Sequence, residues 1–447
     1  MKRARIVCLC ICLLMLISCG KTGAPTPVGT TALQTTAAST AAQTTTEATT
    51  EATTAPPQEI CDVLDAPIVR GVGTAGAINL YRDIVEARFG GRPKRVLLEE
   101  FDPEKEDSAV IIQYDESYSD WEYTISCDGE NAEIKAKASA AIDYAVSRFL
   151  QEYVDDEGNF IPCEVRNTVL RLRDPCILPY GGKYYIVGTG YSMRVSDDLH
   201  SWSDPWQFFV PKDCKNPAFD GVGDYWAPEL YEYNGKFYVF GTYKSAATGH
   251  RGVAVFRSDL PEGPYELISE GHATPKDWDS IDGSLYVDEN GDPWMVFVHE
   301  WTSMPDGIGT MVASRMTPDL TALTGEITTL FSASDLVGNP NNNVTDGPYV
   351  YRFENGRLAI IWSGFADGYR VGVCYSDNGI LGPWVQADEP LYSGSLDNPL
   401  CYQEGGHGML FETFDGRLLM SFHSPNSTYE AVTYREVIAE DGYLRLK

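Results

Sequence analysis

From residue 166 to the C-terminus, the chain alternates short apolar runs with tight-turn signals, and one phrase recurs five times. Each copy is a strand-forming run, a turn that contains glycine, and a second apolar run. The turn glycines are Gly182, Gly235, Gly291, Gly356 and Gly416. Because Asn-Gly and Asp-Gly supply the positive φ of a two-residue turn, each phrase predicts a β-hairpin.

The spacing of these hairpins predicts how the strands assemble. Successive turn glycines lie 53, 56, 65 and 60 residues apart, which suits one four-stranded blade with long loops. A simple β-sandwich would also alternate strands and turns, but it would not repeat one phrase at near-constant spacing. We therefore predict an all-β five-bladed β-propeller over residues 166–447.

A different pattern occupies residues 59–165. Helical periodicity is expected over residues 77–89 and again over 139–153, where apolar side chains recur at the spacing of one buried helix face. Four short apolar runs lie between these helices, at residues 95–101, 109–114, 121–127 and 132–138. The pattern predicts a small α/β sandwich domain in front of the propeller, with structural support as its expected role.

The first 18 residues read as an export signal of the bacterial lipoprotein type. Lys2, Arg3 and Arg5 precede an apolar run over residues 6–17, which is too short to span a bilayer. Cleavage before Cys19 would leave that residue carrying lipid, as the only attachment to a membrane. The expected location is the outer surface of a bacterium. An ordinary secreted protein with an incidental cysteine remains the alternative.

Residues 19–58 are expected to form a disordered linker. Between residues 22 and 57, Thr and Ala account for 23 of 36 positions and there is no aromatic residue. Such a segment cannot bury enough surface to offset its ordering entropy. It is interpreted as a flexible tether.

Composition narrows the class of ligand. The net charge of −30 repels nucleic acid and anionic lipid, so a neutral ligand and no nucleic-acid partner are expected. Of the eleven cysteines, seven lie beyond the signal region, and their wide spacing matches neither a zinc pattern nor a dense disulfide framework. We expect a monomer.

Four chemically active residues follow the repeat. Asp174, Asp282, Asp346 and His407 each lie a similar distance before a hairpin turn. The innermost strand of every propeller blade starts near the central axis, so these side chains are expected to converge at one end of the channel. Asp-Pro and Asp-Gly also begin turns for structural reasons alone, but three aspartates that follow the repeat favour a functional interpretation.

Clustered carboxylates repel one another, so one should hold its proton near neutral pH while another stays ionised. Glycoside hydrolysis requires this division. One group protonates the leaving oxygen, and the other activates water or attacks the sugar carbon. The cluster therefore indicates a glycosidase.

Four motifs carry a resemblance to a known family. They are Arg173-Asp174-Pro175, Trp226-Ala227-Pro228-Glu229, Ile281-Asp282-Gly283-Ser284 and Gly406-His407-Gly408. Together they resemble glycoside hydrolase family 43, five-bladed propeller enzymes that cleave arabinose- and xylose-containing plant polysaccharides with inversion. The resemblance covers about residues 166–447.

The resemblance implies a role for each carboxylate. Asp174 would be the general base that deprotonates water, and Asp282 would tune and orient the acid. The family's acid is a Glu in a Glu-Gly-Pro motif, whereas this chain has Asp346-Gly347-Pro348. Asp is shorter by one methylene, roughly 1 Å, and a misplacement of that size can cost about a hundredfold in rate. We expect Asp346 to act as the acid; Glu300, Glu404 or a loss of catalysis are the alternatives.

Further residues are assigned to binding. Trp226 offers a flat aromatic face for the apolar face of a sugar ring, and its motif partner Glu229 and Arg173 are expected to bind substrate. The resemblance implies that His407 helps to hold a central hydrated calcium ion; a buried structural histidine is the alternative. No other cofactor is expected.

These arguments predict a glycosidase that hydrolyses α-L-arabinofuranosyl or β-D-xylosyl linkages in arabinan, arabinoxylan or xylan fragments by single displacement. A carbohydrate-binding propeller that has lost catalysis is the main alternative. A fructan hydrolase is disfavoured because the Asn-Asp-Pro-Asn opening typical of those enzymes is absent from the sequence.

Overall fold

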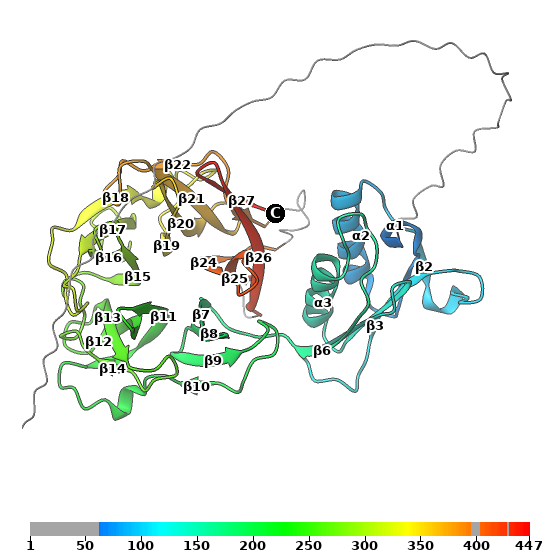
Figure 1. Ribbon diagram of the computed structural model, residues 1–447, viewed down its shortest axis with the longest axis horizontal. Helices are drawn as coiled ribbons and strands as arrows, with labels where there is room; N and C mark the ends of the chain where they lie inside the picture. The colour runs from blue at the N-terminus through cyan, green and yellow to red at the C-terminus, as the bar shows by residue number, and fades with distance from the viewer. Residues whose placement is uncertain (1–61, 395–402, 427–428) are drawn as a thin grey trace, which may run out of the picture. The chain divides into compact units, whose positions relative to one another are not determined.

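The computed structural model describes residues 62–394, 403–426 and 429–447. Five antiparallel sheets stand around a common axis, with the first strand of each sheet nearest the centre (Figure 1). The five-bladed propeller predicted from the repeat is therefore confirmed. The expectations for residues 1–18 and 19–58 fall on the part of the chain that the structure does not describe.

Each blade is built from one continuous stretch of chain. Blade one contains β7 (Cys176–Tyr180), β8 (Lys183–Gly188), β9 (Ser192–Ser196) and β10 (Trp206–Gln207). Blade two contains β11 (Gly221–Tyr233), β12 (Lys236–Ser245), β13 (Arg251–Ser258) and β14 (Glu266–Leu267). Blade three contains β15 (Ser280–Val287), β16 (Pro293–His299), β17 (Thr310–Arg315) and β18 (Thr328–Ser332).

The last two blades complete the ring. Blade four contains β19 (Asp346–Arg352), β20 (Leu358–Phe365), β21 (Tyr369–Ser376), β22 (Val385–Gln386) and β23 (Tyr392–Ser393). Blade five contains β24 (Gly406–Glu412), β25 (Leu418–Ser424), β26 (Ala431–Glu440) and β27 (Tyr443–Leu446). Three short 3₁₀ turns lie in loops of the described chain, at η1 (Leu98–Glu100), η2 (Pro211–Asp213) and η3 (Ala333–Asp335).

The prediction of two-residue hairpin turns holds for two blades and is wrong for three. Blades one and two turn through Gly181-Gly182 and Asn234-Gly235, with positive φ at both positions. Blades three, four and five use five-residue loops in which Gly291, Gly356 and Gly416 have positive φ. In blade three the Asp288 carboxylate accepts hydrogen bonds from two backbone N–H groups of the loop, at 2.9 and 3.0 Å. Such side-chain capping stabilises the longer turn.

Blade five meets blade one without sharing a strand with it. Apolar side chains of β24 and β25 join the core cluster of blade one. Hydrogen bonds also cross this seam: the Ser421 hydroxyl donates to the Pro175 carbonyl at 3.0 Å, and the Asp174 N–H donates to His423 Nδ1 at 3.4 Å. Arg173 Nη1 donates to Asn426 Oδ1 and Glu430 Oε1, each at 2.9 Å. Side-chain packing and these hydrogen bonds together hold the ring closed.

The smaller domain is an α/β layer structure, as predicted. Its sheet has the order β2-β1-β3-β5-β4-β6, in which β2, β1, β3 and β5 run parallel and β4 runs antiparallel to both of its neighbours, β5 and β6. The strands are β1 (Ile68–Arg70), β2 (Arg95–Leu97), β3 (Ala109–Tyr114), β4 (Glu122–Cys127), β5 (Asn131–Ala136) and β6 (Cys163–Thr168). The last strand of this sheet thus ends three residues beyond the expected boundary at residue 165.

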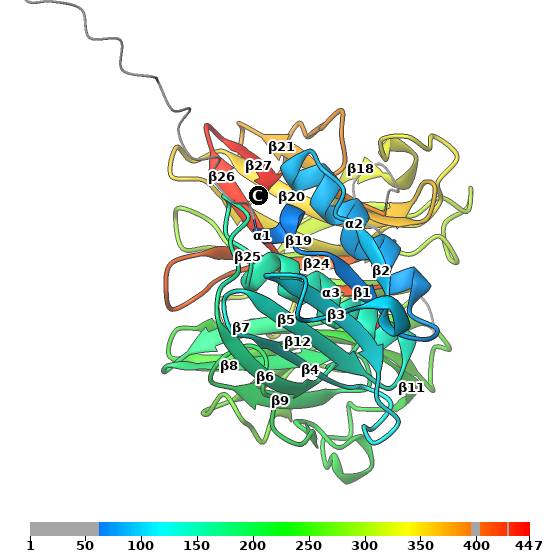
Figure 2. The same ribbon diagram turned by 90° about the vertical axis from the view of Figure 1, so that its right-hand side faces the viewer.

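Two helices of this domain match the predicted ones closely. They are α2 (Ala75–Phe89) and α3 (Ser139–Glu152), and a short α1 (Asp62–Asp65) precedes them (Figure 2). Their buried faces share one core with the strands. Within the described part of the chain, every helix is too short or too polar to cross a bilayer.

Candidate active site

The inner strands of the blades share a local irregularity where they reach the axis. In blades two to five, one extra residue interrupts the register of the first strand against the second. Each of the five inner segments carries a residue of positive φ at the equivalent point: Asp174, Ala227, Asp282, Gly347 and His407, at 55°, 37°, 55°, 50° and 55°. A β-bulge re-aims its side chain, and strained backbone of this kind gathers at functional sites.

The bulges show which residues are equivalent. Asp174, Asp282 and His407 occupy the positive-φ position, as the common spacing predicted, whereas Asp346 lies one residue earlier and Gly347 takes that position. A β-carbon on Gly347 would lie 2.9 Å from His407 Cγ, so the imidazole fills the space of the missing side chain. Asp346 therefore approaches the centre from a neighbouring position in its blade.

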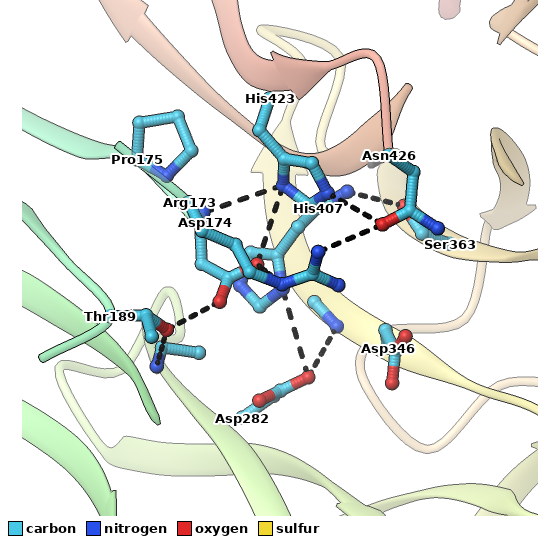
Figure 3. Close-up of polar contacts among 12 residues, drawn as sticks. Arg173, Asp174, Pro175, Thr189, Asp282, Asp346, Ser363, His407, His423 and Asn426 are labelled. Carbon is cyan, nitrogen blue, oxygen red and sulfur yellow. Dashed lines mark hydrogen bonds and ion pairs between the residues drawn. The ribbon is translucent and has the colours of Figure 1, made fainter. Parts of the chain in front are cut away.

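A pocket of about 340 Å³ opens over this ring of bulges. Six of the seven residues predicted for the site line it, namely Arg173, Asp174, Trp226, Asp282, Asp346 and His407. Glu229 does not line it. The pocket also receives Thr189, Glu300, Trp301, Phe365 and Tyr369, so one wall is rich in aromatic rings. Figure 3 shows His407 in contact with Asp174 and Asp282, and Asp346 beside them without a drawn contact.

Asp174 is buried and is held in its ionised form. Its Oδ2 accepts a hydrogen bond from the Thr189 hydroxyl at 2.5 Å, and Arg173 Nε lies 3.7 Å from Oδ1. Burial opposes ionisation, but the nearby histidines, Arg173 and the Thr189 hydrogen bond outweigh it and lower the pKa of Asp174. An ionised carboxylate that points into a pocket can take a proton from water.

The histidine behind Asp174 is neutral. Burial lowers the pKa of His423 to about 4. Its Nδ1 accepts the Asp174 N–H at 3.4 Å, and Nε2 lies 3.2 Å from Asn426 Oδ1, an arrangement that places the proton on Nε2 (Figure 3). Burial lowers the pKa of His407 as well, so near neutral pH Arg173 and Thr189 are the groups that keep Asp174 ionised.

Asp282 lies between Asp174 and the blade that carries Asp346. Its Oδ2 accepts the Gly347 N–H at 2.9 Å, and its own N–H donates to the Thr242 hydroxyl at 3.1 Å. His407 Nδ1 lies 3.8 Å from Asp282 Oδ2 and 3.4 Å from Asp174 Oδ1. Burial, followed by the charges of Asp346 and Asp174, raises the pKa of Asp282.

The pKa of Asp346 is shifted in the opposite direction to that of Asp174. Its Oδ2 accepts a hydrogen bond from the Tyr369 hydroxyl at 3.0 Å. Burial raises the pKa of Asp346 to about 7, although the Tyr369 bond acts in the other direction. A carboxyl group with this pKa is protonated in a large fraction of molecules near neutral pH, as a general acid must be.

The two alternative acids are placed less well. Glu300 lines the pocket, but its Oε2 lies 2.7 Å from Arg251 Nε in an ion pair. The Glu404 carboxylate accepts the Tyr369 backbone N–H at 2.8 Å and does not line the pocket. Of the three candidate acids, Asp346 is thus the one that lines the pocket without a cationic partner at bonding distance in the described chain.

An aromatic platform stands at the rim. Trp226 is 37% exposed, and the Arg251 guanidinium lies 5.1 Å from its ring centroid. Arg251 is itself held by Glu300 and by Asp224, whose Oδ2 lies 3.3 Å from Nη1. The arginine therefore fixes the orientation of the indole ring at the pocket mouth.

The Glu229 side chain lies outside the pocket. Its side chain is 2% exposed, and the Tyr231 hydroxyl donates to it and also contacts Ser284 Oγ at 2.9 Å. Burial raises the pKa of Glu229 to about 8. It is a buried carboxyl that joins blades two and three beneath the pocket, without direct access to a substrate.

The hydrated calcium ion expected near His407 would keep its waters and stays a prediction. No group of three or more His, Cys, Asp or Glu side chains among the described residues is arranged to hold a metal. His407 Nδ1 instead faces the carboxylates of Asp174 and Asp282. We therefore derive no catalytic step through a metal.

Sequence reasoning missed several pocket residues. Trp301, Phe365 and Tyr369 lie outside the inner strands, at the ends of second or third strands of their blades. The only available signal was their position near the loops that follow β16 and β20. Loop shape decides whether such residues reach the axis, and the repeat does not encode it.

Comparison with known proteins agrees with the resemblance to glycoside hydrolase family 43. The model described as "Glycosyl hydrolases family 43" matches residues 165–441. An extracellular exo-α-(1→5)-L-arabinofuranosidase of Cellvibrio japonicus is 30% identical over 146 residues, which cover 29% of this chain and 41% of that protein. An extracellular endo-α-(1→5)-L-arabinanase of Bacillus subtilis is 25% identical over 152 residues, which cover 30% of this chain and 45% of that protein. The match thus spans less than half of either curated relative.

A solved structure matches over a longer stretch. The crystal structure of an endo-arabinase from Bacteroides thetaiotaomicron is 38% identical, with a TM-score of 0.54, over 61% of this chain and 96% of that one. Its likeness supports the fold over nearly the whole of that structure.

Proposed function

The chain belongs to glycosyl hydrolases family 43, and from this membership and its central carboxylates we propose that it hydrolyses glycosidic bonds in arabinose- or xylose-containing polysaccharides. The two curated relatives and the solved structure described above are named for action on arabinan or arabinofuranosyl linkages. α-(1→5)-Linked arabinan is therefore the proposed polymer, ahead of xylan.

One observation carries the proposal: two buried carboxyl groups of a single pocket have pKa values shifted in opposite directions. The pKa of Asp174 is lowered and that of Asp346 is raised to about 7. Near neutral pH Asp174 is a carboxylate and Asp346 is protonated in a large fraction of molecules, which is the division required by acid–base glycoside hydrolysis.

The proposed reaction is a single displacement. The Asp174 carboxylate takes a proton from a water molecule as that water attacks the anomeric carbon. Asp346 gives its proton to the glycosidic oxygen as the bond to that oxygen breaks. Asp282 orients the acid through the Gly347 N–H, and Trp226 supports a sugar ring at the pocket mouth.

The test measures turnover and the anomer released first. Purified protein is incubated with linear α-(1→5)-arabinan, arabinoxylan and xylan, and early products are followed by proton NMR. We expect arabinan to be cleaved with inversion, and Asp174→Asn and Asp346→Asn each to lower turnover by about a hundredfold or more. Exposed Asp197, which pairs with Lys183, provides a matched control because Asp197→Asn should change nothing. Binding of arabinan without turnover by the wild type would instead identify a non-catalytic binding propeller.

We also propose that the protein acts outside the cell. Both curated relatives are named extracellular. The basic and apolar opening of the chain followed by Ser18-Cys19 supports export and a lipid on Cys19. Incorporation of labelled palmitate that is lost in Cys19→Ala would support the anchor, and equal labelling of both forms would refute it. A monomer is proposed in solution, to be checked by sedimentation.

A further inference from the structure

The short side chain of Asp346, the proposed acid, must be held in position, and a group that can hold it lies on β21 of the same blade. An Asp carboxyl is about one methylene closer to its backbone than a Glu carboxyl, and acid catalysis depends on reach to within about 1 Å. Asp346 also lies one residue before the bulge position, where Gly347 makes room for His407. If Asp346 acts as the acid under the proposed function, its short side chain needs another group to fix the position of the carboxyl.

Tyr369, the first residue of β21, is in place to do this. Its hydroxyl donates to Asp346 Oδ2 at 3.0 Å. Among the residues drawn in Figure 3, no dashed contact reaches the Asp346 carboxyl. The Tyr369 phenol, which Figure 3 does not draw, is the side-chain hydrogen-bond donor to Asp346 in the described structure.

Tyr369 is itself fixed from several sides. The Glu404 carboxylate accepts its backbone N–H at 2.8 Å, and its backbone carbonyl accepts the Gly405 N–H at 3.0 Å. Its ring stacks on His423, with centroids 5.6 Å apart and planes at 21°. A β-carbon on Gly406 would lie 2.3 Å from Tyr369 Cε1, so the ring packs where only glycine leaves space.

This arrangement decides which oxygen of the acid holds the proton. An oxygen that accepts the phenolic hydrogen serves as the carbonyl oxygen of the protonated acid. The acidic proton is then carried on Oδ1, the other oxygen. The hydrogen bond also stabilises the carboxylate that forms after proton transfer, and it opposes the burial that raises the pKa of Asp346.

We propose that Tyr369 is the positioning residue that allows an aspartate to serve as the general acid here, by binding Oδ2 of Asp346 and holding the transferable proton on Oδ1. This inference rests on the proposed function. Tyr369 lies outside the repeated motifs. Glu404 would contribute indirectly, because its carboxylate holds the Tyr369 backbone.

The experiment compares Tyr369→Phe with the wild type on two substrates. An α-(1→5)-linked arabino-oligosaccharide needs a proton on its leaving oxygen, whereas 4-nitrophenyl α-L-arabinofuranoside has a leaving group that departs with little acid assistance. We expect kcat/KM for the oligosaccharide to fall about tenfold or more, and kcat/KM for the aryl substrate to fall much less. Equal losses on both substrates would refute the proposal.

The pH profile supplies a readout that misfolding alone would not move. Loss of the phenolic hydrogen bond removes a group that favours the Asp346 carboxylate, so the pKa of Asp346 should rise. The high-pH limb of kcat/KM should then shift to higher pH in Tyr369→Phe. A limb that stays in place would refute the proposal.

Two further variants complete the design. Tyr375 lies on the same strand, and its hydroxyl accepts the Leu444 N–H at 3.1 Å, so Tyr375→Phe removes a tyrosine hydrogen bond away from the pocket and should leave the profile unchanged. In Asp346→Glu the carboxyl moves away from the phenol, so adding Tyr369→Phe should cost less than it does in the wild type. Additive losses would overturn the inference. Failure of the wild type to cleave any arabinoside would instead overturn the proposed function.

Discussion

Replacing Gly347 by alanine tests whether the imidazole of His407 occupies the space of a missing side chain. An added β-carbon would lie 2.9 Å from Cγ and 3.0 Å from both Cδ2 and Nδ1 of His407. The ring would have to move, and it is buried and close to Asp174 and Asp282. Overpacking of this kind costs about 1–3 kcal/mol.

The backbone adds a second cost that a matched variant can separate. Gly347 has a φ of 50°, and a non-glycine residue in the left-handed region costs roughly 1–2 kcal/mol. Gly356, in the hairpin of the same blade, has a φ of 86°, and a β-carbon there would meet no atom within 4 Å. Gly356→Ala therefore carries the backbone cost alone, about 1–2 kcal/mol, and Gly347→Ala should cost about 2–5 kcal/mol in total.

The assay measures thermal midpoints and turnover of both variants. Each kcal/mol corresponds to about 2–4 °C for a domain near this size, so Gly347→Ala should melt several degrees below Gly356→Ala. Its kcat on arabino-oligosaccharide should also fall by about tenfold, because the displaced ring disturbs the carboxylates. Equal midpoints for the two variants, or full activity of Gly347→Ala, would show that His407 does not depend on this space.

Four other perturbations have defined outcomes. Asp174→Asn should lower kcat/KM by about 10²- to 10⁴-fold at an unchanged melting temperature, because only the base is lost; activity within tenfold of wild type would exclude Asp174 as the base. The wild-type kcat/KM should decline above about pH 7 as Asp346 loses its proton, and rise with pH at its acid limb below the ordinary Asp range because Asp174 has a lowered pKa; a plateau to pH 9 would contradict the acid assignment. Glu229 has a folded pKa of about 8, above its unfolded value, so folding takes up a proton and wild-type stability falls as pH rises from about 4.5 to 8; Glu229→Gln should remove this loss of up to about 1.4 kcal/mol per pH unit, seen in urea titrations at pH 5 and pH 8. Trp226→Ala should raise KM for oligosaccharide about tenfold with a smaller change in kcat, while Trp206→Ala, outside the pocket, should leave KM unchanged.

The repeat predicted the fold and most of the candidate site because propeller geometry is periodic. Each blade begins at the axis, so residues at one distance before the hairpin meet, and Asp174, Asp282 and His407 do so. Asp346 fits the count only approximately. Asp346 lies one residue before the bulge position, which Gly347 occupies. Spacing along the sequence does not show which of the two residues takes the bulge position.

The positions of Tyr369 and Glu229 could not be predicted from the sequence, because they depend on side-chain packing between blades. Tyr369 reaches the pocket because Gly406, on the next blade, leaves room for its ring, and no spacing along the chain encodes that approach. Glu229 shows the reverse case. It belongs to a motif that resembles a substrate-binding one, but the strand past the bulge turns its side chain into the buried layer beside Tyr231 and Ser284.

The seam between blades five and one passes beside Asp174, the proposed base. Asp174 stands on one side of it, while His423, Asn426 and Glu430, which contact Asp174 or Arg173, stand on the other. Separation at this seam would remove these contacts without breaking the hydrogen bonds inside any sheet. We therefore expect a covalent bond engineered across the seam to lengthen the half-life of activity at elevated temperature.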